Sequence, residues 1–473
     1  MSNQFDSQMC LSGMVRDIPF GPIHGATNEV ALSACRLERC WETGFGSCAG
    51  GNMKKIVVFM VLLLAVAGGT WAAEPLTLAE ALAVARANHP QVEEAAAGLA
   101  AAEARQGQAM AGYLPQINIS ADWSRGESFL TALGSIKETE LTTTAVTLRQ
   151  NIYDFGRTSG TYDAAKGAKR AAVQGLAATR QDVAMRVKSA WYLLHSAEQQ
   201  VEASRKTVEA REALFHQAAE FFNHGVRSRV EKARSEANLF AAKSLLIRAE
   251  NNRALARLEL ANAMGVPVLP DRPLAEAAAA GDPAVAGDVA LLREEAMTAR
   301  PELKRLAALA EAADAGRRAA RSGYLPTLSG VASVGEAAKS VLPDGPVWTL
   351  GVAVNLPLFS GFSTREQVRE AEASQRGVAA QLSNQRLLVI RDVDAAWLGV
   401  QEAKARREAS ESEAMAAREG ETLAMARYRE GVGSLVEAID AQAQAMNAET
   451  ALIQAGYDQC VAAVRLERAL GRE

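Results

Sequence analysis

The sequence predicts a mainly α-helical protein that is internally duplicated, with a small β part in each copy. Three observations lead to this fold class. First, alanine, glutamate, arginine, glutamine and leucine dominate the 473 residues and aromatic residues make up only 5%, a composition typical of long helices. Second, several motifs occur twice in the same order. Third, residues that alternate between apolar and polar precede each long helical stretch.

Length and charge narrow the possible classes of protein. A chain of this length holds two or three ordinary domains, or one elongated and repeated structure. The formal net charge is only −4, and nothing in the sequence indicates a nucleic-acid binder.

The first 52 residues differ in composition from the rest of the chain and hold Cys10, Cys35, Cys40 and Cys48. From Met53 the chain reads MKKIVVFMVLLLAVAGGTWAA, the charged, apolar and then small-residue plan of a secretory signal peptide. We expect residues 53–72 to be removed and Ala73 to begin the mature chain. Because a signal peptide works only at the N-terminus, we expect residues 1–52 to be a non-native upstream extension. The alternative is a small cysteine-rich metal module, but these cysteines lack a complete ligand pattern.

Two copies of one plan follow the predicted signal peptide. The tetrapeptide Gly112-Tyr113-Leu114-Pro115 returns as Gly323-Tyr324-Leu325-Pro326. Further pairs are His89-Pro90 and Arg300-Pro301, Trp191 and Trp397, Gly225-Val226 and Gly431-Val432, and Ala263-Met264-Gly265 and Ala469-Leu470-Gly471. We therefore expect one repeat over residues 73–265 and another over 289–473. The proline-rich residues 266–288 are the predicted linker.

Each repeat begins with a predicted helical stretch, Leu78–Ala111 or Asp288–Ser322. We expect this stretch to end at Gly-Tyr-Leu-Pro, because glycine can adopt the left-handed cap conformation and proline has no amide donor. The residue before proline is pushed to extended geometry, so a strand can start there. The predicted helix-to-strand junctions are Gly112, Tyr113 and Pro115, and Gly323, Tyr324 and Pro326.

Two β-hairpins are predicted, over residues 113–152 and 324–358. The clearest alternation places Ile117, Ile119, Ala121 and Trp123 on one side of the first hairpin, and Trp348, Leu350, Val352, Val354, Leu356 and Leu358 on one side of the second. Thr142–Ile152 and Thr327–Val334 are weaker candidates. Four strands of about nine to eleven residues have the length at which a tilted strand crosses a bilayer. A small soluble sheet packed on the helices is the alternative.

Aromatic residues lie near the ends of these strands, where interfacial aromatic residues sit in membrane proteins. They are Tyr113, Trp123, Tyr324 and Trp348. Ordinary packing near turns explains them equally well.

A long helical stretch follows each hairpin. Arg157–Phe222 would run on the order of 100 Å at about 1.5 Å per residue. Its apolar positions step by four and three residues, which predicts coiled-coil packing with Arg211 as an interruption. Gly225 and Gly431 permit a tight reversal, after which the helix returns antiparallel. The predicted seam is Val183, Val187, Ala190, Leu194, Ala197, Val201, Ser204, Val208, Phe215, Ala218 and Phe222, repeated by Val389, Val393, Ala396, Val400 and Ala403.

Four strands cannot close a barrel, since the smallest transmembrane barrels need about eight. Lipid tolerates no open sheet edge, so strands that cross a membrane must be shared among several chains. We therefore expect a homo-oligomer. The secretory signal, the amphipathic strands and the lack of an apolar helix in the mature sequence together indicate a Gram-negative-type outer membrane, with the helices in the periplasm.

In its order of motifs the chain resembles the TolC-type outer-membrane efflux family, the outer membrane factors of tripartite export systems. The resemblance covers Leu76 to Gly471. It rests on the duplicated GYLP, on NIYDFGR and NLPLFSGF after the hairpins, on FNHGVRS and YREGVGSLVEAIDAQ at the reversals, and on ANAMG and RALG at the ends of the repeats. It implies a homotrimer in which four strands per chain form a twelve-stranded β-barrel, continuous with an α-barrel of long helices.

The resemblance also implies partners. In this family the helix reversals form a periplasmic mouth that meets an adaptor (membrane fusion) protein and, through it, an inner-membrane pump. The expected docking tips are Gly225, Val226, Arg227, Ser228 and Arg229, and Gly431, Val432, Gly433, Ser434 and Leu435. The family narrows its mouth with an acidic ring just before the second tip, but here Thr422 and Met425 stand where acids are expected. Glu419 and Glu421 nearby are the predicted constriction.

The expected function is a passive exit duct for efflux or type I secretion, driven by the inner-membrane partners. We expect no enzyme, cofactor site or metal site: the sequence has no P-loop and no His-Glu-x-x-His motif. His89, His195, His216 and His224 show no ligand spacing. The alternative is a periplasmic coiled-coil scaffold or adaptor, which would normally carry one helical hairpin where this chain has two. The sequence does not identify the exported substrate.

Overall fold

The computed structural model describes residues 75–130, 135–275, 288–338 and 345–472. The chain divides into the units Met1–Ala72 and Ala73–Glu473, and the described residues all belong to the second unit. The predicted signal peptide, the upstream extension with its four cysteines and the predicted mature start at Ala73 lie outside the described residues. Residues 276–287 of the predicted linker 266–288 also lie outside the described residues.

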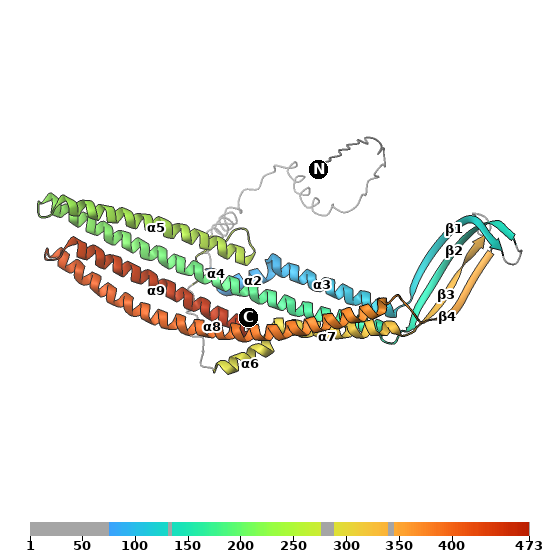
Figure 1. The fold of residues 1–473 in the computed structure, drawn as a ribbon. Helices are drawn as coiled ribbons and strands as arrows, with labels where there is room; N and C mark the ends of the chain where they lie inside the picture. The colour runs from blue at the N-terminus through green and yellow to red at the C-terminus, as the bar shows by residue number, and fades with distance from the viewer. Residues whose placement is uncertain (1–74, 131–134, 276–287, 339–344, 473) are drawn as a thin grey trace, which may run out of the picture. The chain divides into compact units, whose positions relative to one another are not determined.

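The two described halves repeat one order of elements, which confirms the predicted duplication (Figure 1). The first half contains α2 (Leu78–Asn88), α3 (Pro90–Met110), β1 (Gln116–Leu130), β2 (Ser135–Tyr153), α4 (Arg157–Asn223) and α5 (Arg229–Met264). The second half contains α6 (Val289–Ala299), α7 (Pro301–Arg321), β3 (Thr327–Ala338), β4 (Gly345–Asn355), α8 (Ser363–Arg429) and α9 (Leu435–Leu470).

The helical stretch that begins each half is broken, which the prediction missed. His89 and Arg300 both have extended backbone, with ψ of 124°, and so separate α2 from α3 and α6 from α7. The cause is the proline that follows each of them, because proline disfavours helical geometry in the preceding residue. Pro90 and Pro301 then begin the next helix, where their missing N–H costs no hydrogen bond.

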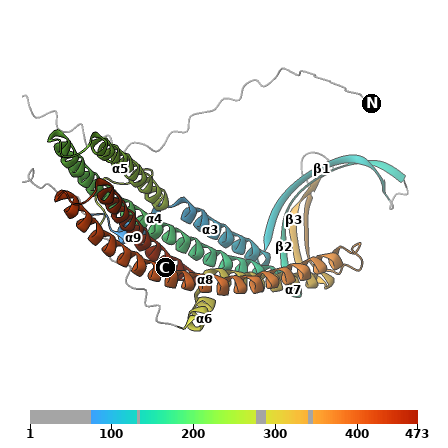
Figure 2. The ribbon, with the colours of Figure 1, turned by 60° about the vertical axis from the view of Figure 1, so that its left-hand side comes forward.

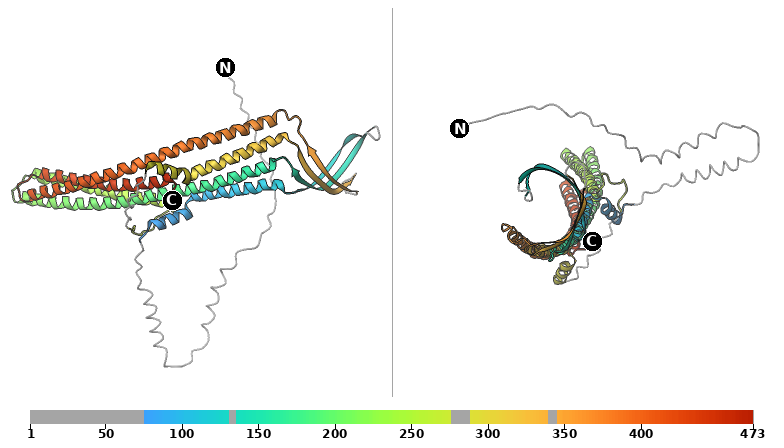
Figure 3. Two further views of the ribbon diagram at one scale, coloured as in Figure 1. Left: turned by 90° about the horizontal axis from the view of Figure 1, so that it is seen from below. Right: turned by 90° about the vertical axis from the view of Figure 1, so that its right-hand side faces the viewer.

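Two helical hairpins form the long part of the unit Ala73–Glu473. α4 and α8, with 67 residues each, pack against α5 and α9, with 36 residues each. α4 also packs along α9, so α4 and α9 lie between α5 and α8 (Figure 1). Nearer the sheet, α3 packs on α4, and α7 contacts both α4 and α8 (Figure 3). The sheet lies at one end of the long helices and the two hairpin turns lie at the other (Figure 1).

In the described part of the chain, no helix has both the length and the apolar character needed to cross a membrane.

The predicted seam of α4 is confirmed over most of its length. The predicted positions that are buried are Val183, Val187, Ala190, Leu194, Val201, Ser204 and Ala218, and in α8 Val389, Val393, Val400 and Ala403. Two assignments were wrong. Arg211 does not interrupt the seam but is buried on it, because it lies one heptad after Ser204. Leu214 is buried where Phe215 was predicted.

Buried apolar side chains of the described residues gather in separate clusters along the helices. One surrounds Trp191 and Leu194, and another surrounds Val389 and Val393. A third cluster lies next to the hairpin turns and is called the tip cluster here. It consists of Leu214 from α4, Tyr428 from α8, and Leu435, Ala438 and Ile439 from α9, so it joins the two helical hairpins.

The strands form one curved antiparallel sheet of order β1-β2-β3-β4 (Figure 2). The predicted length of nine to eleven residues holds for β4, with 11, but not for β1, β2 and β3, with 15, 19 and 12. β1 and β2 extend past β3 and β4. Residues Ser135 to Leu141 of β2 pair only with β1, since β2 pairs with β3 from Thr142 onward. Leu356 and Leu358 follow the end of β4 and are not part of it, contrary to the prediction.

Candidate functional site

The sheet has one apolar and one polar face. Residues that pair across strands point to the same side of a sheet. On one side the pairing gives the rows Ile119, Val146, Val334 and Trp348, and Ile117, Leu148, Ala332 and Leu350. On the other side it gives the row Asn118, Thr147, Ser333 and Thr349. The predicted alternation is therefore confirmed and is continuous across all four strands.

No helix among the described residues covers the apolar face of the sheet. The exposed fraction is 75% for Ile119 and 78% for Trp348. Large apolar side chains are exposed on each of the outer strands, where the hydrophobic effect opposes contact with water. We therefore expect this surface to be buried, either in an apolar environment or against a partner protein.

Exposed aromatic residues lie at the helix end of the sheet and within it. The predicted residues Tyr113, Trp123, Tyr324 and Trp348 are all exposed. Trp123 lies in the middle of β1 and not near its end, contrary to the prediction, because β1 continues to Leu130. Sequence analysis missed two further pairs where the hairpins lead into α4 and α8: Tyr153 with Phe155, at 4.6 Å between ring centroids, and Phe359 with Phe362, at 5.5 Å. Both pairs lie in the corresponding segments NIYDFGR and NLPLFSGF, which could have indicated them.

The helix-to-strand junctions are built differently from the prediction. Gly112 and Gly323 lie in short 3₁₀ turns, η1 (Ala111–Tyr113) and η2 (Ser322–Tyr324), and neither has the positive φ that was predicted for it. Space for a side chain is limited at both glycines. A Cβ at Gly112 would lie 3.0 Å from Cγ2 of Thr158, and a Cβ at Gly323 would lie 3.0 Å from Cγ2 of Thr364. Each junction thus packs against the first turn of the following long helix. Pro115 and Pro326 directly precede β1 and β3, as predicted.

The first strand-to-helix junction is organised by Asp154, which sequence analysis did not single out. Its buried carboxylate accepts hydrogen bonds from Asn151 Nδ2 at 2.7 Å and from the backbone N–H of Thr158 at 2.9 Å. It thereby satisfies a free N–H at the start of α4. The second junction has Leu358 in the corresponding place, and there Ser360 Oγ lies 3.0 Å from Thr364 Oγ1.

The two predicted docking tips lie side by side. Gly225 and Gly431 both have positive φ, 71° and 80°, which allows the tight reversals. Arg227 of the first tip donates hydrogen bonds to the backbone oxygens of Gly431 at 3.1 Å and Gly433 at 3.2 Å. Within one chain, Arg227 therefore ties the first tip to the second.

The residues of the predicted tips differ in what they present. Val226, Ser228, Arg229, Gly431, Val432 and Ser434 are exposed, whereas Gly433 and Leu435 are buried. Leu435 belongs to the tip cluster, and a Cβ at Gly433 would lie 3.0 Å from the backbone of Arg427 and Tyr428. Ser434 accepts the N–H of Glu437 at 3.1 Å and so caps α9.

Tyr428 lies at the centre of the tip cluster and was not predicted as a site residue. It is fully buried, packs edge-to-face on Phe221 and has the Arg227 guanidinium 5.9 Å from its ring centroid. Its hydroxyl has no hydrogen-bond partner among the described residues. Burial, and then the charge of Glu231, raise the pKa of Tyr428 above its ordinary value.

The two acids of the predicted constriction have different surroundings. Glu419 is exposed, whereas Glu421 is partly buried and faces Arg211. Residues two positions apart on a helix point in nearly opposite directions, so α8 does not bring these two side chains together. Burial raises the pKa of Glu421, and the charge of Arg211 opposes this rise without cancelling it.

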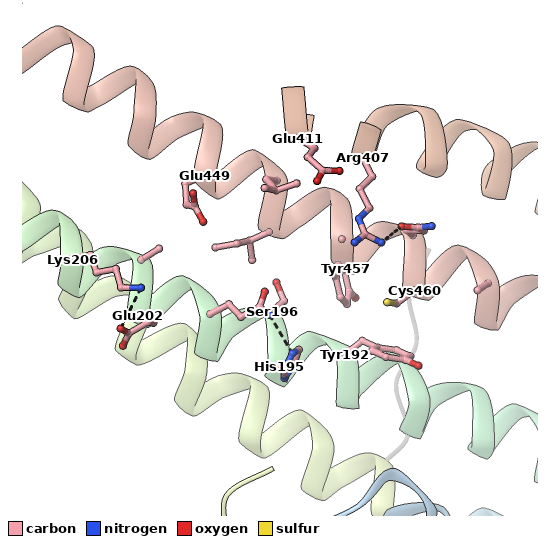
Figure 4. Close-up of a pocket in the computed structure, with 17 residues that line it drawn as sticks. Tyr192, His195, Ser196, Glu202, Lys206, Arg407, Glu411, Glu449, Tyr457 and Cys460 are labelled. Carbon is pink, nitrogen blue, oxygen red and sulfur yellow. Dashed lines mark hydrogen bonds and ion pairs between the residues drawn. The ribbon is translucent and has the colours of Figure 1, made fainter. Parts of the chain in front are cut away.

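A groove lined by both polar and apolar side chains runs between the two helical hairpins on the sheet side of the tip cluster (Figure 4). It has a volume of about 570 Å³ and is lined by α4, α8 and α9. Tyr192 and His195 of α4 face Tyr457 and Cys460 of α9 across it, and Arg407 of α8 bonds Gln459 at 2.7 Å. A second cavity of about 370 Å³ adjoins it toward the tips and shares Lys206 and Glu449 with it. No group of His, Cys, Asp and Glu in the described ranges could hold a metal ion.

Comparison with known proteins shows what this arrangement is similar to. The family model described as "Outer membrane efflux protein" matches residues 81–266 and 292–472. Protein CyaE of Bordetella pertussis is 28% identical over 383 residues, which cover 79% of this chain and 80% of that protein. The outer membrane efflux protein BepC of Brucella suis is 24% identical, over 89% of this chain and 90% of that protein.

The fold is also that of a solved structure. The Campylobacter jejuni CmeC outer membrane channel superposes with a TM-score of 0.73, covering 85% of this chain and 90% of that one. At 18% identity this likeness concerns the fold alone.

Proposed function

The chain belongs to the outer membrane efflux protein family, and we propose that three copies of it form one duct that a pump of the inner membrane drives through an adaptor protein. Family membership makes the chain an exit duct in the outer membrane of a Gram-negative-type cell, with its helices in the periplasm, and not an enzyme. The trimer, the adaptor and the roles of single residues are parts of the proposal.

The observation that carries the function is the uncovered apolar face of the sheet. Lipid is the apolar environment that such a face fits, and the polar opposite face suits a water-filled interior. The alternative of a soluble sheet packed on the chain's own helices would bury this face, whereas Ile119, Leu350 and Trp348 are exposed.

Closure of the sheet requires further copies. β1 and β4 are the edges of the sheet, and a membrane tolerates no unpaired edge. Pairing of β4 in one copy with β1 in the next extends the sheet by four strands per copy. Three copies give twelve strands, which exceeds the approximate minimum of eight for a transmembrane barrel.

The helices carry matching evidence of a lateral partner. α5 and α8 are the outer helices of the two hairpins, and each presents an apolar stripe to solvent. The stripes are Phe240, Ile247 and Leu258 on α5, and Leu387, Leu398 and Leu423 on α8. Spacings of seven and eleven residues on α5, and of 11 and 25 residues on α8, are close to whole numbers of helical turns and keep each stripe on one face of its helix. The α5 stripe of one copy packing on the α8 stripe of the next makes a repeating contact that closes as a ring.

The tips supply the surface for the adaptor. The exposed apolar side chains of Val226, Val230 and Val432 lie beside the exposed arginines Arg229 and Arg429. This surface fits a partner that offers apolar side chains with acidic ones at the rim. Glu419 and Glu421 keep their proposed place near the mouth, with Glu421 as the more buried of the two.

Cell fractionation and cross-linking test this proposal. The mature protein is expected in the outer-membrane fraction, soluble only with detergent, and amine cross-linking of the purified protein is expected to give dimer and trimer bands and none larger. A periplasmic scaffold or adaptor, the rival function, would be released without detergent. Protein found in the soluble periplasmic fraction would therefore overturn the duct.

A further inference from the structure

Each half of the chain has a joint between its first two helices, and the two joints are built alike. His89 separates α2 from α3, and Arg300 separates α6 from α7, each followed by a proline. The glycine that ends α5 or α9 packs against the joint. A Cβ at Gly265 would lie 2.8 Å from Cα of His89, and a Cβ at Gly471 would lie 3.1 Å from the backbone nitrogen of Arg300. Both joint residues are buried, with exposed fractions of 7% and 6%.

The side chains at the two joints differ in the charge that they can carry. Arg300 is always charged, and its Nε donates to the backbone oxygen of Ala469 at 2.8 Å while its Nη1 lies 3.4 Å from Asp392. His89 is an acceptor instead: its Nδ1 takes the backbone N–H of Gln91 at 3.2 Å and so caps α3. A histidine nitrogen accepts a hydrogen bond only when it carries no proton. The first joint therefore requires a neutral histidine.

The surroundings of His89 also oppose a positive charge on its ring. Burial lowers the pKa of His89 from the ordinary value of 6.5, and the charge of Arg186 on α4 lowers this pKa further. Arg86 in the last turn of α2 and Glu93 in the first turn of α3 carry charges of opposite sign. The last turn of α5, which packs on the joint, has no charged side chain. Burial and Arg186 thus favour the same neutral form as the cap does.

We propose that the first joint is an acid-sensitive switch built on His89. Protonation adds a hydrogen to Nδ1, which removes the acceptor for the N–H of Gln91 and leaves that donor without its partner. Protonation also places an imidazolium at the positive end of α3 and beside Arg186. Acid therefore frays the first turn of α3 and loosens the contact of His89 with Gly265. The second joint keeps its hydrogen bonds, because arginine does not titrate in this range.

Loosening of the joint acts on one end of α3. In the described chain α3 packs mainly on α4 and leads directly to β1 (Figure 1). The cap at His89 fixes the end of α3 that lies farther from the sheet. The other end stays held by the close contact of Gly112 with Thr158, which involves no titrating group.

The sign and the range of the switch follow from proton linkage. The pKa of His89 is lowered in the closed joint and returns to about 6.5 when the joint opens, so the open joint binds more protons. The closed joint is therefore most stable above this value and loses stability as the pH falls below it. A group that titrates at about 6.5 only in the open joint shifts the opening equilibrium by at most about tenfold between about pH 7.5 and about pH 5.5.

Hydrogen exchange of the full chain in detergent, read by mass spectrometry at these two pH values, tests the switch. Exchange rates are divided by the intrinsic rate at each pH, so that only opening is compared. We expect the protection of the peptide that begins at His89 to fall several-fold in acid. The peptide that begins at Arg300 is the internal control and should keep its protection.

Two variants separate titration from loss of the cap. Asparagine caps helices through a side-chain oxygen and does not titrate, so His89→Asn should keep its protection at both pH values. His89→Ala has no cap and should show low protection at both. Unchanged protection of the first joint in acid, or an equal loss in His89→Asn, would overturn the switch. Neither readout depends on conduction, so the proposed duct is tested separately.

Discussion

Arg227 shows how one side chain links the two tips. Its guanidinium donates to two backbone oxygens of the second tip and lies over Tyr428 of the tip cluster. A hydrogen bond to a charged group contributes about 1.5–3 kcal/mol where it is shielded from water. At this partly exposed site the contribution is toward the low end of that range.

Arg227→Ala should therefore loosen the tips. We expect single-channel recordings of the variant in planar bilayers to show a higher mean conductance or a larger open fraction than the unchanged chain. Arg205→Ala, which removes an exposed ion pair with Glu250, is the matched control and should behave like the unchanged chain. If Arg227→Ala and the unchanged chain gave identical conductance traces, this arginine would not restrict the opening at the tips.

Glu302 carries a pH dependence of stability. Burial alone would raise its pKa, but the hydrogen bond and charge of Arg468 outweigh burial and lower the pKa below its ordinary value of 4.5. A carboxylate with a lowered folded-state pKa adds stability above its unfolded-state pKa and loses it as the pH falls through the folded-state value. The contribution is thus present at neutral pH and disappears in acid.

Thermal unfolding between about pH 3 and pH 6 tests this assignment. The unfolding temperature should fall with pH more steeply in the unchanged chain than in Glu302→Gln, which has no carboxylate to titrate. Glu311→Gln, which alters an exposed ion pair with Arg170, serves as the control. Parallel curves for Glu302→Gln and the unchanged chain would show that the Arg468 pair does not contribute.

At the scale of the elements, α4 and α7 approach closely through glycine. A Cβ at Gly167 would lie 2.8 Å from the Cβ of Ala312 and 3.1 Å from the backbone oxygen of Ala308. Gly160 makes a similar contact with Ala319. Gly316 of α7, by contrast, has nothing within 4 Å of the place where a Cβ would stand.

The two glycines should respond to alanine with opposite signs. Gly167→Ala pushes the backbones of α4 and α7 apart and should lower the unfolding temperature, because close-packed backbones cannot give way cheaply. Gly316→Ala should raise stability by about 0.5–1 kcal/mol, since alanine reduces the entropy lost on forming a helix. If both changes lowered the unfolding temperature, the close approach of α4 and α7 would not explain the effect of Gly167→Ala.

How far the sequence predicts the elements depends on how local their causes are. The start of α4 at Arg157, the reversals at Gly225 and Gly431 and the two faces of the sheet follow from glycine placement and periodicity, and all of them were predicted. The extension of β1 and β2 was not, because the residues after Trp123 lose the alternation. The backbones of Phe155 and Phe362 have positive φ. The sequence does not predict this, because bulky residues rarely adopt positive φ.

The candidate site was predicted in the same uneven way. The tips were found because glycine marks a reversal, but the bonds of Arg227 to the second tip depend on residues far away in the sequence. A charged residue in an apolar pattern indicates exposure, so the sequence predicts that Arg211 interrupts the seam. Its burial depends on the cavity formed with α8 and α9, which only the fold reveals.

At the scale of the whole molecule, the proposed assembly places the apolar stripes on α5 and α8 at contacts between copies. Ile247 is 67% exposed and Leu423 is 60% exposed within one chain. Burial of such a side chain contributes about 1.5–3 kcal/mol. The stripes therefore favour assembly through the helical part of the chain.

Ile247→Asp should weaken assembly, because a charge buried between copies has no partner. Cross-linking of the purified variant in detergent is expected to give more monomer and less trimer than the unchanged chain. Ile247→Leu keeps the apolar contact and should assemble normally. A full trimer yield for Ile247→Asp would place the contact between copies elsewhere.

Conductance of the purified protein in planar lipid bilayers is the decisive measurement for a water-filled duct that several copies share. We expect discrete current steps of uniform size, which appear with the trimer fraction and not with the monomer fraction. A trimer that inserts no conducting path, or a monomer that conducts equally well, would refute the shared duct.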